Sequence, residues 1–116
     1  MTMTPFEIMA GMKDAIDSMH TLLGELEVLN IEAAEAECAY RKKKNTEMLE
    51  SMYKTVAERT AEAAVNSASA KEKAMIYSEK LKICYEACRN ARQEVSAYQS
   101  MLNIVKIDES TSRHGA

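Results

Sequence analysis

The chain has 116 residues, enough for one domain, and it contains three glycines, one proline and no tryptophan. Its formal net charge is −3, and so few helix breakers favour long uninterrupted helices. No apolar run approaches the roughly 18 residues that a membrane-spanning helix needs, so we expect no membrane association. With three cysteines and no charged leader before an apolar core, the sequence predicts a reduced, cytoplasmic protein.

The first predicted helix covers residues 5–53. Pro5 suits the first turn of a helix, and Thr4 precedes it as an N-cap. Apolar residues then recur at alternating steps of three and four residues, which is the heptad spacing of a coiled-coil seam. The members of this seam are Met12, Ala15, Met19, Leu22, Leu26, Leu29, Ala33, Ala36 and Tyr40. The seam loses its register at Arg41, and an apolar face resumes only after Asn45.

A short second helix is predicted over residues 56–65 and a long third helix over residues 70–106. Thr55 and Glu58 match a capping box, in which each side chain caps the backbone N–H group of the other residue. The third helix has its own heptad seam, formed by Ala74, Tyr77, Leu81, Cys84, Cys88, Ala91, Val95, Tyr98, Leu102 and Val105. Residues 108–116 lack apolar anchors, and we expect them to form a disordered tail.

Two long helices with matching seams predict an all-α fold, a long antiparallel helical hairpin with a short intervening helix. We expect this coiled-coil-like hairpin to form a single domain over residues 1–107. Much of its apolar content is Ala and Met, which give a small and flexible core, so an isolated hairpin would be marginally stable. The chain is therefore predicted to self-associate into a homo-oligomer.

Charge is distributed unevenly along the sequence. Residues 1–38 carry a net charge of −7, whereas residues 39–54 and residues 71–106 each carry +3. Cations that follow a phosphate backbone, with aromatic rings on which bases stack, are what binding of single-stranded nucleic acid requires. The candidate phosphate-binding residues are Arg41, Lys42, Lys43, Lys44, Lys80, Lys82, Arg89 and Arg92, and the candidate stacking residues are Tyr40 and Tyr85. The alternative interpretation of these cations is a solvated charged face.

Catalytic and metal-binding chemistry has little support in the sequence. No nucleophile, base and orienting group form a recognisable set, and there is no Gly-rich phosphate loop. We therefore predict no enzymatic activity, no cofactor and no small-molecule substrate. Cys84 and Cys88 lie four residues apart, with Cys38 on the other arm. Because a structural zinc site needs four ligands, these cysteines are better explained as small apolar residues, and no metal site is predicted.

Several stretches carry a resemblance to a known class of proteins. The sequences EAAEAECAYRKKKNTEMLES and KTVAERTAEAA, followed by a helix that ends in RNARQEVSAYQSMLNIVK, resemble small helical proteins encoded by bacteriophages. The likeness covers residues 30–106 approximately, and TVAER is its most specific part. Such proteins resemble members of phage replication and recombination modules. The layout is also similar to that of the recombination mediator of T-even phages, an oligomeric helical protein that binds single-stranded DNA and helps to load a recombinase.

This resemblance implies a non-enzymatic factor of phage DNA transactions that binds single-stranded DNA as an oligomer in the cytoplasm of the host cell. A recombinase is the implied partner. The chain departs from the phage pattern at Cys84, Cys88 and Ala91, which replace bulkier residues. Two other functions stay open. One is an acidic helical module that binds, and inhibits or adapts, a host protein; the other is a structural coiled-coil scaffold or assembly chaperone.

Overall fold

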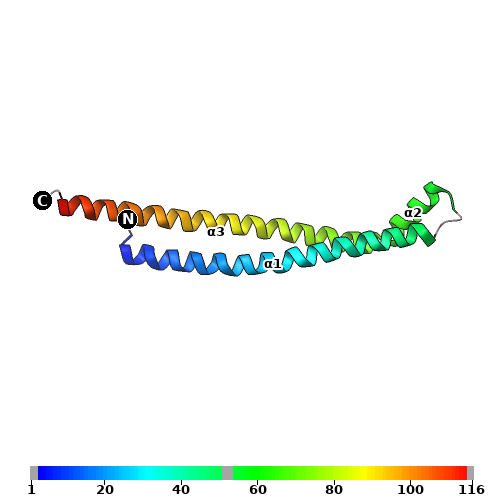
Figure 1. The fold of residues 1–116 in the computed structure, drawn as a ribbon, viewed down its shortest axis with the longest axis horizontal. Helices are drawn as coiled ribbons and strands as arrows, with labels where there is room; N and C mark the ends of the chain where they lie inside the picture. Colours follow the sequence, from blue (N-terminus) through cyan, green and yellow to red (C-terminus); the bar gives the residue numbers. More distant parts are fainter. Residues whose placement is uncertain (1–2, 51–53, 115–116) are drawn as a thin grey trace. The chain divides into compact units, whose positions relative to one another are not determined.

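A computed structural model describes residues 3–50 and 54–114, with side chains as far as residue 108. In this part of the chain there are three helices, α1 (Pro5–Glu50), α2 (Val56–Asn66) and α3 (Ala68–His114), and no strand. The fold is all-α, a long helical hairpin in which α1 and α3 run in opposite directions and the short α2 intervenes (Figure 1). The predicted fold class is confirmed.

The chain divides into two compact units. The first unit contains Met1–Glu25 and Tyr85–Ala116, and the second contains Leu26–Cys84. Each unit pairs a stretch of α1 with a stretch of α3, and α2 belongs to the second unit. The expectation of a single domain over residues 1–107 stays a prediction.

The N-terminal caps predicted for the first two helices are present in the structure. At α1 the backbone N–H of Glu7 donates to Thr4 Oγ1 at 3.2 Å, and the N–H of Thr4 donates to Glu7 Oε2 at 3.3 Å. At α2 the N–H of Glu58 donates to Thr55 Oγ1 at 3.2 Å. These bonds satisfy backbone donors that have no partner inside the helix, and so they fix where each helix begins.

The first two predicted helices agree with the structure. The predicted range 56–65 matches α2, which ends one residue later. The predicted range 5–53 matches α1 as far as Glu50, and its remaining residues, 51–53, lie outside the described residues. The break between α2 and α3 falls at Ser67, a buried residue whose Oγ and backbone N–H both donate to the carbonyl oxygen of Ala63.

The third helix is longer than predicted at both ends. It begins at Ala68 and continues to His114, so the predicted range 70–106 and the predicted disorder of the tail from residue 108 require correction as far as His114. The physical reason is propagation: a helix that already exists gains one hydrogen bond for each residue added. The sequence offers no Gly or Pro to stop this growth before Gly115.

The two heptad seams form the core of each unit. All nine predicted seam positions of α1 and all ten of α3 are buried or half-buried. The most deeply buried of them are Ala15, Ala36, Ala74, Cys84, Cys88 and Ala91. The prediction missed Ile8, which is 3% exposed and extends the α1 seam by one step of four residues. These most deeply buried positions are all alanine or cysteine, and such small side chains let paired helices approach closely.

A close approach of this kind occurs in the first unit at Gly11. A Cβ atom on Gly11 would lie 2.7 Å from the Cε1 and Cζ atoms of the Tyr98 ring, well inside van der Waals contact. At Gly24, also in the first unit, a Cβ atom would meet no neighbouring atom within 4 Å. The first glycine therefore makes room for an aromatic ring of α3, and the second does not.

We expect Gly24→Ala to raise the free energy of unfolding by about 1 kcal/mol, because alanine is the better helix former. Gly11→Ala gains the same propensity but must displace the Tyr98 ring, so we expect a net loss of about 1 kcal/mol. Urea denaturation followed by circular dichroism, at one protein concentration, measures both variants. Equal gains in the two variants would show that Tyr98 moves aside without cost.

Candidate functional site

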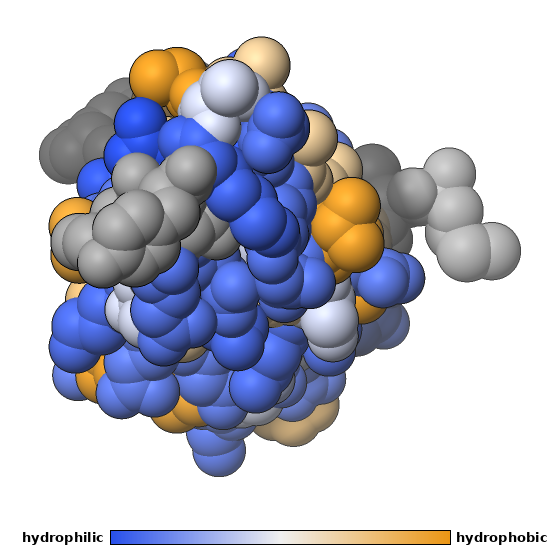
Figure 2. All heavy atoms as spheres, turned by 90° about the vertical axis from the view of Figure 1, so that its right-hand side faces the viewer, coloured by the Kyte–Doolittle hydropathy of each residue, from blue (hydrophilic) through white to orange (hydrophobic). Residues whose placement is uncertain are grey.

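The basic residues of the second unit are concentrated in one part of it. Residues 39–84 contain ten basic and six acidic residues, whereas residues 26–38 contain four acidic residues and no basic one. The end that carries α2 is mostly hydrophilic, with hydrophobic side chains at separate places (Figure 2). An anionic ligand would therefore be attracted to this part of the unit, in spite of the negative net charge of the chain.

Two members of the predicted basic cluster are paired with carboxylates of their own helix. Arg41 Nε lies 3.0 Å from Glu37 Oε1, and Lys43 Nζ lies 3.2 Å from Glu47 Oε1. Ion pairs of this i,i+4 type on a helix surface contribute little to stability. Their consequence here is electrostatic, because each carboxylate offsets the charge that a phosphate group would otherwise meet.

Of the other two members of the cluster, one lines a cavity and one does not. Lys42 is exposed on α1, but Lys44 is half-buried and lines a cavity of about 800 Å³ in the second unit. All three helices contribute to its lining: Tyr40 comes from α1, Thr60 from α2, and Lys71 from α3. Methionine and isoleucine side chains of α3 supply apolar surface. An aromatic ring and apolar surface beside lysines can bind a polyanion that also carries flat, stackable groups.

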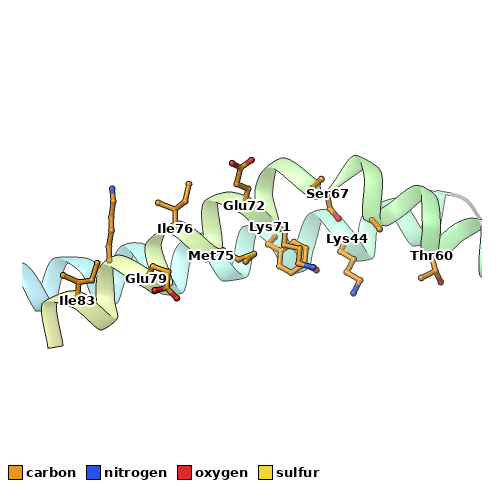
Figure 3. A pocket seen from close by; sticks show the side chains of 13 residues that line it. Lys44, Thr60, Ser67, Lys71, Glu72, Met75, Ile76, Glu79 and Ile83 are labelled. Carbon is orange, nitrogen blue, oxygen red and sulfur yellow. The ribbon is translucent and has the colours of Figure 1, made fainter. Parts of the chain in front are cut away.

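The residues that line this cavity lie on two sides of α3 (Figure 3). Ile76 and Glu72 are on one side of the helix, and Met75 and Lys44 are on the other. Lys71 precedes Met75 by four residues and so shares its face of α3, as Tyr40 shares the face of Lys44 on α1. We call the set of Tyr40, Lys44, Thr60, Lys71 and Met75 on this second side the basic groove. Glu79, four residues after Met75, lies at the edge of this groove (Figure 3).

The remaining predicted site residues lie outside the basic groove. Lys80 lines the cavity, and its Nζ lies 5.2 Å from the centroid of the Tyr77 ring. Lys82 is paired with Glu79 at 3.2 Å. Three exposed residues belong to the first unit, namely Tyr85, Arg89 and Arg92. Of the ten predicted residues, the structure thus brings only Tyr40, Lys44 and Lys80 to the cavity.

Three groove residues, Thr60, Lys71 and Met75, were not among the predicted site residues. A signal for Lys71 does exist in the heptads, because Lys44 follows the seam residue Tyr40 by four positions and Lys71 precedes the seam residue Ala74 by three. In an antiparallel pair these positions flank the seam on the same side. No comparable signal exists for Thr60, because its place depends on how α2 packs.

A polar contact joins α1 to α2 near the groove. Glu47 Oε2 accepts a hydrogen bond from Asn66 Nδ2 at 2.9 Å, and its Oε1 lies 3.2 Å from Lys43 Nζ. The hydrogen bonds from Asn66 and Lys43 favour the charged carboxylate and lower the pKa of Glu47 below its ordinary value of 4.5. Because Asn66 is the last residue of α2, this contact holds that end of α2 against α1.

We expect Glu47→Gln to lower the free energy of unfolding at neutral pH but not at acidic pH. The pKa of Glu47 is lower in the folded state than in the unfolded state. The stabilisation that its charged carboxylate gives is therefore fully present above the unfolded pKa, and it is lost as the pH falls through the folded pKa. Denaturation of the variant and the wild type between about pH 7 and about pH 3 measures the difference. Glu27→Gln, which removes an exposed carboxylate of α1, is the control; a difference for Glu47→Gln that does not shrink at low pH would contradict the expectation.

Comparison with known proteins leaves the site to be interpreted from its own residues. No protein-family model, no curated protein and no solved structure matches the chain. None of the described helices is both long enough and apolar enough to cross a membrane. Among the residues that the structure describes, no three His, Cys, Asp or Glu side chains are grouped so that they could hold a metal ion.

Proposed function

We propose that this chain is a non-enzymatic protein that binds single-stranded nucleic acid in the basic groove of its second unit. The observation that supports this most is the presence of Tyr40, Lys44 and Lys71 around one cavity. Lys44 and Lys71 come from two antiparallel helices, so their ammonium groups can follow the phosphates of one strand. The Tyr40 ring and the Met75 side chain offer surfaces on which bases can rest.

The preference for single strands follows from the stacking surface. In a duplex the faces of the bases are already covered by their neighbours, and only the phosphates would be accessible to the groove. In a single strand the bases can leave the stack and cover Tyr40. Because every base has a flat face, this contact predicts little dependence on base sequence.

The biological setting belongs to the same proposal. The resemblance over approximately residues 30–106 supports a role in phage recombination or replication, in which the chain self-associates and passes the strand to a recombinase in the host cytoplasm. Self-association would repeat the basic groove in one assembly. That repetition raises the local positive potential of a chain whose formal net charge is −3.

A second candidate function is supported by exposed apolar side chains at the start of α1. Phe6 and Met9 are 81% and 58% exposed and lie within residues 1–38, whose net charge is −7. A partner protein with a basic and apolar surface would cover them. In this case the chain would inhibit or adapt a host protein through its acidic arm.

Fluorescence anisotropy with labelled single-stranded and double-stranded oligonucleotides of one sequence tests the proposal. We expect tighter binding to the single strand and a linear fall of log affinity with log salt concentration. Absence of binding at low salt would reject nucleic acid as the ligand. Equal or tighter binding to the duplex would reject Tyr40 as a stacking surface.

A further inference from the structure

In the second unit, one face of α3 carries four exposed side chains that would complement the same four side chains of a second copy of the chain. Ile76 and Ile83 are 48% and 68% exposed. Glu79 and Lys80 lie between them in the sequence and are exposed as well. Steps of three and four residues place all four on one face of the helix. Figure 3 shows Ile76 on the side of α3 away from Met75. All four residues also line the cavity of the second unit, so this face adjoins the basic groove.

The spacing of these residues is the same from residue 76 to 83 as from residue 83 to 76. In the reverse direction the isoleucines stay at the ends, and the glutamate and the lysine exchange places. An isoleucine, two residues, glutamate, lysine, two residues and an isoleucine follow one another. Consider a second copy of α3 that lies alongside in the opposite direction, with a two-fold axis between residues 79 and 80. Ile76 then faces Ile83 of the second copy, and Glu79 faces Lys80 of the second copy. Each contact occurs twice, because a two-fold interface is isologous.

A parallel arrangement of the same faces is opposed by charge. With the two helices in register, Glu79 would face Glu79 of the second copy, and Lys80 would face Lys80 of the second copy. Like charges placed opposite each other in an interface are unfavourable. The antiparallel arrangement converts both repulsions into attractions and covers the same isoleucines, so charge selects the second copy's direction as well as its register.

We propose that this face is a homodimer interface, in which two copies of α3 pack antiparallel through Ile76, Glu79, Lys80 and Ile83. Glu79 is at present paired with Lys82 at 3.2 Å, and both side chains are largely exposed, so exchanging this pair for an intermolecular one costs little. The patch covers only about 10 Å of helix, which predicts a weak, concentration-dependent dimer. The inference specifies the self-association part of the proposed function and does not depend on nucleic-acid binding.

Charge reversal tests both the face and the register. Glu79→Lys would bring four cations together at the two-fold axis, and Lys80→Glu would bring four anions together. We expect each variant to raise the dimer dissociation constant at least about tenfold in sedimentation equilibrium of the full chain. The double variant Glu79→Lys/Lys80→Glu restores both attractive pairs and is expected to dimerise like the wild type. A mixture of the two single variants is expected to form a mixed dimer.

The matched control is Glu27→Lys, which makes the same change in net charge at an exposed position of α1. We expect it to leave the dissociation constant unchanged, and circular dichroism checks the helix content of every variant. A monomeric wild type at high concentration, single variants that dimerise normally, or a double variant that fails to dimerise would each overturn the proposal. Sedimentation without nucleic acid reports on the dimer alone, and anisotropy with the wild type and with Glu27→Lys reports on the basic groove, so failure of the dimer and failure of the groove are distinguishable.

Discussion

Replacement of Lys44 and Lys71 by alanine is expected to weaken binding of a single-stranded oligonucleotide about 25-fold at about 0.1 M salt. For single strands each phosphate contact adds about 0.7 to the slope of log affinity against log salt, so the loss of two contacts lowers the slope by about 1.4. Both lysines line the cavity that also contains Tyr40. Anisotropy titrations of the variant and the wild type over a salt series measure affinity and slope together.

The matched control for this pair is Arg41→Ala/Lys82→Ala. It removes the same charge from the same unit, but Arg41 and Lys82 are already paired with Glu37 and Glu79 on their own helices. We expect a loss of less than about threefold, because Arg41 and Lys82 lie outside the basic groove and a neighbouring carboxylate competes with a phosphate for each of them. Equal losses in the two double variants would mean that binding follows total charge, and the groove would lose its assigned role.

Ala36→Asp is expected to lower the free energy of unfolding by about 3 kcal/mol or more. Ala36 lies in the α1 seam and is 7% exposed, so a carboxylate there would be buried without a partner. Ala34, two residues earlier in the same acidic stretch, is exposed. Ala34→Asp should cost less than about 1 kcal/mol, which is its loss of helix propensity. Urea denaturation of both variants checks the difference, and similar losses would contradict the assignment of the seam.

The fold of this chain can be predicted from its sequence, because a heptad repeat determines which positions face a partner helix. The predicted seam positions, from Met12 to Tyr40 and from Ala74 to Val105, are all buried or half-buried. The same periodicity carries no information once the apolar residues end. The last turns of α3 were for that reason predicted as disordered, although no helix breaker stands between Asp108 and His114.

The candidate site was less predictable, because a run of cations in sequence does not say where each side chain points. Carboxylates four residues away, Glu37 and Glu47, pair with Arg41 and Lys43, and both pairs follow from ordinary helical spacing. The groove residues of α2 and α3 join Lys44 only because the chain folds back on itself. Thr60 in particular depends on the packing of α2, which no local pattern specifies.

Photocrosslinking tests most directly whether nucleic acid lies in the basic groove. A single strand that contains bromouracil would be irradiated with the full chain, and the crosslinked peptides would be identified by mass spectrometry. We predict crosslinks at Tyr40 and in the peptide that contains Lys71 and Met75, with the first lost in Tyr40→Leu. Crosslinks confined to the first unit, for example at Tyr85 or Tyr98, would contradict the assignment of the groove as the binding site.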